Sequence, residues 1–197
     1  SGKTVVAQYA MLLAVSHGYQ AAMMAPTEVL ARQHARTLER SLSASKVRIG
    51  LLTGSISPAR RRELLEKIAA GTIDLIVGTH AVVHAIARSE ARFAKLGLVV
   101  IDEQHKFGVR ERAALRQAGL EPHYLVMTAT PIPRTVSMTL FGDLDVSTLR
   151  AAPPGRQPVH TYFAADDKRD RWWEFFGRKL REGRQGFVIA PLVEERE

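Results

Sequence analysis

The sequence predicts an α/β fold with a mostly parallel sheet that is covered by helices on both faces. Five short apolar runs are spaced along the first 130 residues, and each is typical of a strand buried on both sides. Helix-like segments lie before and between these runs. A steady succession of strand, helix and strand implies right-handed crossovers between parallel strands, with helices covering the sheet.

Each predicted strand is one of the apolar runs, and each predicted helix occupies a stretch outside them. The strands are expected, in chain order, at AAMMAP (21–26), VRIGLL (47–52), DLIVGT (74–79), LGLVVID (96–102) and HYLVMTAT (123–130). The helices are expected at 4–16, 27–41, 58–70, 79–88, 108–118 and 132–140. Together these elements predict a first domain over residues 1–150.

The pattern changes at AAPPGRQP (151–158), where Pro-Pro-Gly and Gln-Pro steps indicate an extended linker. A strand VHTYFA (159–164), a helix (168–182) and a strand GFVIAPL (186–192) are predicted after it. This order is typical of an opening β-α-β unit. We therefore expect residues 159–197 to begin a second domain.

An aromatic run, RWWEFFGRKL, lies in the predicted helix of that second domain. Aromatic side chains among basic ones resemble a base-stacking surface in composition. However, Trp172, Phe175, Phe176 and Leu180 recur at helical spacing. We therefore expect them to form the face of the helix that packs on its own sheet.

The charge of the chain favours a polyanionic partner such as nucleic acid. Its 28 lysines and arginines against 20 acidic residues give a net charge of +8. The first 150 residues hold 19 of the basic and 12 of the acidic residues, so most of the excess belongs to the first domain. A basic, solvated surface explains the charge equally well.

Two absences limit the classes of function. The chain has no cysteine, which excludes disulfides, cysteine-ligated zinc and a cysteine nucleophile, and which suits a cytoplasmic location. No apolar run approaches the roughly 18 residues of a membrane span, and no signal-peptide pattern opens the chain. We therefore expect no membrane partner.

The first four residues, SGKT, have the form of the last part of a phosphate-binding loop. Such a loop uses backbone N–H groups to hold phosphates, a lysine on the β- and γ-phosphate oxygens, and a hydroxyl on Mg²⁺. Ser1, Gly2, Lys3 and Thr4 provide these groups, and the helix expected directly after them adds positive potential. The tetrapeptide alone is weak support, since Gly-Lys-Thr recurs by chance.

A second motif, which is acidic, completes a candidate nucleotide site together with SGKT. LVVIDEQH places Asp102 and Glu103 at the carboxyl end of an apolar strand, where sheets of this kind bind ligands. An aspartate there can hold Mg²⁺ through water, and the adjacent glutamate can deprotonate the attacking water. The alternative is an acidic pair that caps the following segment. Together with SGKT, the pair predicts a site for ATP and Mg²⁺.

The motifs as a set resemble superfamily 2 helicases and translocases, and more narrowly the RecG-type branched-DNA helicases. Seven segments carry the resemblance in order: SGKTVVA, APTEVLARQH, LLTGS, IVGTHAVV, VIDEQHKFGVRERAAL, MTATPIPRTVSMTLFGDLDVS and PPGRQPVHT. They look like motifs I, Ia, Ib, Ic, II and III and the crossover into the second motor lobe. The transcription-repair coupling translocases share this motor, but they usually have a glutamate in place of Gln104, and PPGR fits the RecG type better.

The resemblance implies the fold and the roles of the nucleotide-site residues. Residues 1–150 would form a RecA-like P-loop NTPase lobe, and residues 159–197 would begin a second one. Lys3, Thr4 and Asp102 would bind the phosphates and Mg²⁺, and Glu103 would be the catalytic base. The remaining motif residues would relay between nucleotide and DNA: Gln104, His105, Thr128, Ala129 and Thr130. Helix capping or packing by the histidine, and local backbone bonds by the threonines, are the alternatives.

Motifs Ia, Ib and Ic imply DNA contacts at strand ends. Their candidate residues are Pro26, Thr27, Glu28, Thr53, Gly54, Gly78, Thr79 and His80. Arg32 and His34, on the helix after motif Ia, could add charge. Contacts from loop N–H groups and hydroxyls to phosphates position a strand without reading its sequence. Sequence-independent binding of branched or double-stranded DNA is therefore expected.

The function implied by the resemblance is that of an ATP-driven DNA translocase, working as a monomer, that remodels forks or Holliday junctions in recombination and repair. The front of motif I, the wedge domain and motifs IV to VI are absent from this sequence, so the fragment itself is expected to be inactive or nearly so. A non-motor P-loop ATPase or kinase would not need the PTE and TAT strand ends. A catalytically silent DNA-binding fragment stays open.

Overall fold

The computed structural model describes residues 2–87, 90–102, 121–128, 145–149, 155 and 159–190. Backbone contacts divide the chain into two units, Ser1–Pro153 and Pro154–Glu197. The predicted helices over 108–118 and 132–140 lie outside the described residues, as does the predicted linker apart from Gly155.

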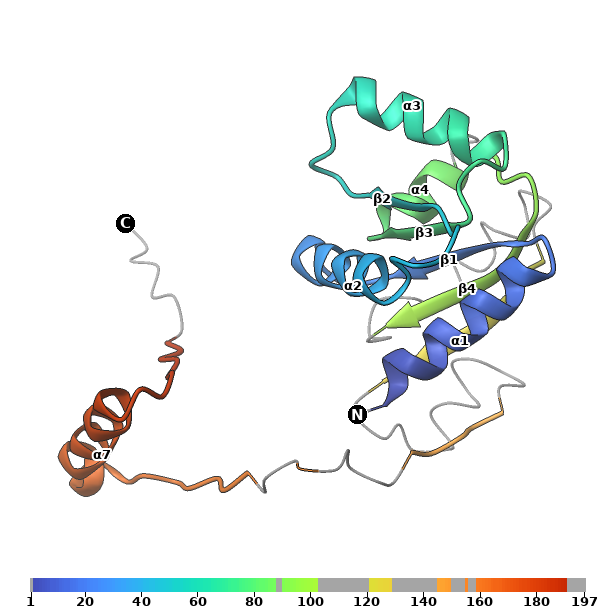
Figure 1. The fold of residues 1–197 in the computed structure, drawn as a ribbon. Helices are drawn as coiled ribbons and strands as arrows, with labels where there is room; N and C mark the ends of the chain where they lie inside the picture. Colours follow the sequence, from blue (N-terminus) through green and yellow to red (C-terminus); the bar gives the residue numbers. More distant parts are fainter. Residues whose placement is uncertain are drawn as a thin grey trace. The chain divides into compact units, whose positions relative to one another are not determined.

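The first unit is built on a parallel sheet, as the sequence predicts (Figure 1). Its strands are β1 (Gln20–Met24), β2 (Ile49–Leu52), β3 (Leu75–Gly78), β4 (Leu96–Asp102) and β5 (His123–Met127), in the spatial order β2-β3-β1-β4-β5. Every pairing is parallel. All five strands therefore end at one edge of the sheet, which we call the carboxyl edge.

Helices cover both faces of this sheet. The helices are α1 (Lys3–Ser16), α2 (Glu28–Ser41), α3 (Pro58–Ala69) and α4 (Ala81–Ala87). Side chains of α1 and α2 pack with Ala21 and Met23 of β1, whereas those of α3 and α4 pack with Ala22 and Met24. Because successive strand residues point to opposite faces, α1 and α2 share one face and α3 and α4 cover the other (Figure 1).

A buried glutamine joins three segments near the start of the sheet. The Gln20 side chain is 5% exposed, and its Nε2 donates to the carbonyl oxygens of Ile68 (3.0 Å) and Ile73 (2.8 Å). Its Oε1 accepts from the backbone N–H of Lys95 at 3.2 Å. These bonds join backbone groups at the end of α3, before β3 and before β4, and the Ile68 carbonyl also accepts from the Gly71 N–H at 3.1 Å.

The second unit contains a short 3₁₀ turn (Asp166–Lys168) followed by helix α7 (Arg169–Arg181), which confirms the helix predicted over 168–182. The strands predicted over 159–164 and 186–192 are wrong in their described part, since residues 159–165 and 184–190 form no strand. Phe163 and Ile189 are more than 90% exposed. A strand needs partners that bury its side chains, and one helix with two short flanking segments provides too little apolar surface for that.

The predicted buried face of α7 is also wrong. Trp172, Phe175 and Leu180 are 39%, 48% and 44% exposed, and no described residue of α7 is buried. With no sheet beneath the helix in the described part of this unit, the aromatic rings pack on one another. Trp172 stacks on Phe176 with ring centroids 5.2 Å apart.

No helix among the described residues is long and apolar enough to cross a membrane.

Candidate functional site

The carboxyl edge collects the residues that the sequence singles out. At or directly after the strand ends lie Pro26, Thr27, Thr53, Gly54, Gly78, Thr79, His80, Asp102 and Thr128. Helix α1 begins at the same edge, because its far end turns at Gly18 straight into the start of β1. The structure therefore brings the described parts of motifs I, Ia, Ib, Ic, II and III to one edge. Ser1, Glu103, Gln104, His105, Ala129 and Thr130 lie outside the described residues.

The first turn of α1 carries the donors of an anion site. Lys3 and Thr4 are the first two residues of the helix. The N-cap position before them is Gly2, which has no side chain that could accept from the N–H groups of the helix. No acidic residue lies in this turn, and a Cβ at Gly2 would meet nothing within 4 Å. Helix N-termini leave N–H groups for an external acceptor and carry partial positive charge. An ammonium, a hydroxyl and these N–H groups are the donors that a phosphate requires.

Asp102 is placed at the end of β4 by the alternation of that strand. Leu98 and Val100 pack in the cluster with α1 and α2, so Asp102, two residues on, faces the same side. Its side chain is 14% exposed, and Oδ2 lies 2.7 Å from Nε2 of His34 in α2, which is 13% exposed. The imidazole of His34, a side chain expected to add charge toward DNA, is therefore engaged with the motif II aspartate.

A signal for the position of His34 is present in the sequence. Ala31, Ala35 and Leu38 are the buried residues of α2, and their spacing marks the face that meets the sheet. His34 directly precedes Ala35 and lies on the flank of that face. Right-handed crossovers put α2 on the side toward which alternate residues of β4 point. These observations place His34 at the interface between α2 and the sheet, whereas its contact with Asp102 depends on the side-chain directions seen in the structure.

The donors at this edge fit a magnesium–nucleotide complex. Mg²⁺ bound with a nucleotide keeps several waters and takes one or two carboxylates together with phosphate oxygens. Asp102 provides a carboxylate and Thr4 a hydroxyl, and the turn at Lys3 provides donors for phosphate. Among the described residues no group of three or more histidines, cysteines and acidic residues could hold a metal by itself. The chemistry thus suits a metal that arrives with phosphate.

The motif Ia and motif Ib segments are joined by a hydrogen-bonded contact, the Glu28–Ser55 contact. Glu28 Oε1 accepts from the Ser55 backbone N–H at 3.0 Å, and Oε2 accepts from the Ser55 hydroxyl at 2.6 Å. The Arg32 guanidinium donates to the same hydroxyl at 3.0 Å. These bonds from Ser55 lower the pKa of Glu28, with Arg32 adding to the effect. The predicted DNA contacts Glu28 and Arg32 are therefore both engaged with Ser55, a residue that was not among the candidates.

Other predicted DNA contacts have structural roles of their own. Thr27 is the N-cap of α2, where its hydroxyl accepts from the Leu30 N–H at 3.3 Å. Thr79 lies two residues before α4 (Ala81–Ala87), and its Oγ1 accepts from the Ala81 N–H, two residues on, at 3.4 Å. Thr53 is 2% exposed. A capping hydroxyl, a turn hydroxyl and a buried threonine fix where the loops leave the sheet.

Gly78 is required by a close approach of β3 to β2. A Cβ at this position would lie 2.3 Å from the carbonyl oxygen of Leu52 and 2.5 Å from Cγ2 of Val82. The Gly78 carbonyl accepts from the Ala25 N–H at 2.9 Å. The residue therefore holds the ends of three strands together. Gly54 and His80 remain partly or fully exposed at this edge.

Comparison with known proteins identifies the family. The sequence profile described as DEAD/DEAH box helicase matches residues 1–139. Two proteins named ATP-dependent DNA helicase RecG are similar over nearly the whole chain. The one from Bacillus subtilis is 48% identical over 99% of this chain and 28% of its own length, and the one from Synechocystis is 49% identical over 100% and 23%. The chain thus spans about a quarter of the length of these relatives.

Solved structures agree with the fold. The structure of RecG bound to a three-way DNA junction matches 98% of this chain and 25% of its own with a TM-score of 0.77 and 38% identity. Yeast Dbp5 bound to RNA and ADP BeF3 matches 71% of this chain and 37% of its own with a TM-score of 0.55 and 21% identity, which supports the fold alone. The predicted α/β RecA-like lobe is confirmed. The chain belongs to the DEAD/DEAH box helicase family, and its similarity within that family is to RecG-type helicases.

Proposed function

We propose that this chain is the nucleotide-binding part of an ATP-dependent DNA helicase that acts on branched DNA. The observation that carries the proposal is the shared carboxyl edge, where the first turn of α1 and the Asp102 carboxylate lie with the motif Ia, Ib and Ic strand ends. Relatives named ATP-dependent DNA helicase RecG and a RecG structure with a three-way DNA junction support it. With this activity, the full-length protein would remodel stalled forks and Holliday junctions in recombination and repair.

The nucleotide would be held by the residues of motifs I and II. The ammonium of Lys3 would bind the β- and γ-phosphates, and Thr4 and Asp102 would hold Mg²⁺. When bound, this metal neutralises charge that develops on the phosphates. Glu103, the residue after Asp102 in motif II, would take the proton of the attacking water.

DNA would be held along its phosphates rather than by its bases. The loops after β1, β2 and β3 leave the sheet at one edge, where their N–H groups would meet phosphates, and the chain carries a net charge of +8. Contacts of this kind fix the position of a duplex but carry no sequence information. Motif II and III residues Gln104, His105, Thr128, Ala129 and Thr130 would connect this surface to the nucleotide. The affinity for duplex DNA should fall as the salt concentration rises. In a plot of the logarithm of the binding constant against the logarithm of the salt concentration, the slope should be roughly −0.9 for each phosphate contacted.

The arrangement of the chain is part of the same proposal. Residues 1–150 would form the first lobe, 151–158 the linker and 159–197 the start of the second lobe. The motor would work as a monomer. The absence of cysteine suits the cytoplasm.

The proposal is tested by phosphate release from MgATP by the full-length protein, with a three-way junction, with linear duplex of equal length, and without DNA. We expect the junction to stimulate release well above the linear duplex, and the variant Lys3→Ala to remove the stimulated rate. Equal rates with and without DNA would contradict a DNA motor. Equal stimulation by linear duplex would favour a translocase of the transcription-repair coupling kind. No release above the Lys3→Ala background would indicate a silent DNA-binding protein.

A further inference from the structure

The contact between His34 and Asp102 has a consequence for the nucleotide site. We propose that His34 is a positioning residue that fixes the orientation of the Asp102 carboxylate, and thereby the affinity of the site for Mg²⁺ in the presence of nucleotide. The inference rests on the proposed ATP site. It assigns a role to a side chain of helix α2 that lies outside motifs I and II.

The geometry of the pair is that of a direct hydrogen bond. Nε2 of His34 and Oδ2 of Asp102 are 2.7 Å apart, and the two residues are 68 positions apart in the sequence. An ionised carboxylate can only accept, so the proton of the bond resides on Nε2. Both side chains are only 13% and 14% exposed, and a hydrogen bond shielded from water is stronger than the same bond on the surface.

Both partners are fixed on rigid elements. Asp102 ends β4, which pairs with β1 on one side and β5 on the other. His34 lies in the second turn of α2, which begins at the Thr27 cap and is held to the motif Ib turn by the Glu28–Ser55 contact. A bond between two such elements restricts rotation of the carboxylate. It also connects Asp102, through one helix, to the strand ends proposed to face DNA.

The chemical reason for such a restriction lies in the preference of Mg²⁺. The ion demands near-octahedral geometry, so a carboxylate that rotates freely loses affinity for it. Side chains that hold metal-binding groups in place typically change metal affinity by about 10–100-fold when removed. His34 would therefore act on metal-dependent nucleotide binding. A purely structural role, anchoring α2 to the sheet, would instead alter stability and leave the requirement for Mg²⁺ unchanged.

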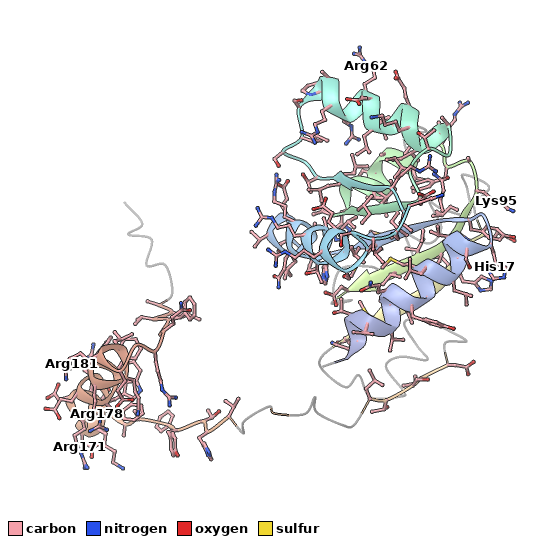
Figure 2. All side chains as sticks on the ribbon, in the orientation of Figure 1. His17, Arg62, Lys95, Arg171, Arg178 and Arg181 are labelled. Atoms are coloured by element: carbon pink, nitrogen blue, oxygen red, sulfur yellow. The ribbon has the colours of Figure 1, made fainter. Side chains whose placement is uncertain are left out.

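The test is a Mg²⁺ titration of fluorescent ADP-analogue binding to the full-length protein. The variant His34→Leu removes the donor at similar size. His34→Gln places an amide N–H near the position of Nε2, whereas the shorter side chain of His34→Asn does not reach it. His17→Leu is the matched control, because His17 is exposed at the end of α1 away from the residue where the helix begins (Figure 2).

We expect His34→Leu and His34→Asn to raise the Mg²⁺ concentration for half-maximal binding about tenfold or more. His34→Gln should restore it to within about threefold of the unmutated protein, and His17→Leu should leave it unchanged. Nucleotide binding without Mg²⁺ should stay the same in all variants. If His34→Leu fails to fold, the comparison of His34→Gln with His34→Asn decides the question.

Three results would overturn the inference. One is an unchanged Mg²⁺ requirement in folded His34→Leu or His34→Asn. Another is an equal loss of binding with and without Mg²⁺, which would indicate a structural role. A third is a defect in His34→Gln as large as that in His34→Asn. If the unmutated protein showed no Mg²⁺-dependent nucleotide binding, the proposed ATP site would fail as well, so the two failures are distinguishable.

Discussion

Substitution of Gly78 by alanine should destabilise the sheet much more than the same substitution at Gly50. Both glycines are buried in neighbouring strands. A Cβ at Gly78 would lie 2.3 Å from the backbone oxygen of Leu52, although Cβ atoms essentially never come within 3.0 Å of another atom. Because Leu52 is also the register partner of Gly78, the two strands have to separate where they pair. At Gly50 the nearest atom is the Cδ1 tip of the Leu64 side chain at 2.7 Å, which can rotate away.

The size of the effect follows from what has to move. Overpacking of a core costs about 1–3 kcal/mol and more where backbone must shift, so we expect about 3 kcal/mol for Gly78→Ala. For Gly50→Ala we expect less than about 1 kcal/mol, since alanine also reduces the entropy of the unfolded chain. At about 2–4 °C per kcal/mol for a chain of this size, the melting temperature of Gly78→Ala should fall by roughly 6–12 °C.

The assay is urea and thermal unfolding followed by far-UV circular dichroism. Equal stability of the two variants would refute the packing role of Gly78. It would leave a contact with DNA as the reason for glycine at the end of β3. Loss of stability in Gly78→Ala without a change at Gly50 would support the close approach of β3 to β2.

Three further predictions concern side chains that hold segments together. Gln20→Leu removes the bonds that Gln20 makes to the Ile73 carbonyl and the Lys95 N–H, and one of the bonds to the Ile68 carbonyl, which keeps the Gly71 N–H, so the free energy of unfolding in urea should fall by about 1–3 kcal/mol. The Arg48 side chain and backbone N–H donate to the Asp74 carboxylate and lower its pKa. The stabilisation from this pair is therefore fully present above the ordinary carboxyl pKa, and it disappears as the pH falls through the lowered pKa of Asp74. Asp74→Asn should therefore cost about 1 kcal/mol at pH 7 and nothing in strong acid, and a difference independent of pH in an unfolding series would contradict this. Glu28→Gln weakens the hold on Ser55, so duplex affinity measured by fluorescence anisotropy should fall about threefold to tenfold while metal-free nucleotide binding stays unchanged.

Much of the first unit was predictable because its strands are buried on both faces. Runs such as LGLVVID have no other stable environment in a chain of this length, and β4 has the predicted bounds, 96–102. Helix ends were less well predicted. The helix expected from residue 79 begins at 81, and the Thr79 hydroxyl instead accepts from the Ala81 N–H in the turn before it.

The second unit shows where local pattern fails. The run GFVIAPL has the composition of a buried strand. Its described residues, however, are exposed and do not pair with any strand. A strand is stabilised by its neighbours, which lie far away in sequence and which a local pattern does not report. The helical spacing of Trp172, Phe175 and Leu180 was correct, whereas the sheet that it was expected to cover is not formed by the described residues.

The candidate site was predictable at the level of motifs and less so at the level of partners. Topology alone brings Thr4 and Asp102 to one edge, since parallel strands end together. The engagement of Glu28 with Ser55 and of His34 with Asp102 depends on side-chain directions that no motif encodes. Glu28 and His34, which were first expected near DNA, thus make hydrogen bonds within the protein.

The central claim is that the carboxyl edge binds and hydrolyses ATP, with the base provided by Glu103. The most direct measurement compares Mg-nucleotide affinity and DNA-stimulated turnover in the full-length protein carrying Glu103→Gln. The substitution keeps the shape of the side chain and removes the base, so kcat should fall by about 10²–10⁴-fold while the dissociation constant stays within about twofold. A parallel loss of affinity and turnover, or turnover that survives the substitution, would contradict the account.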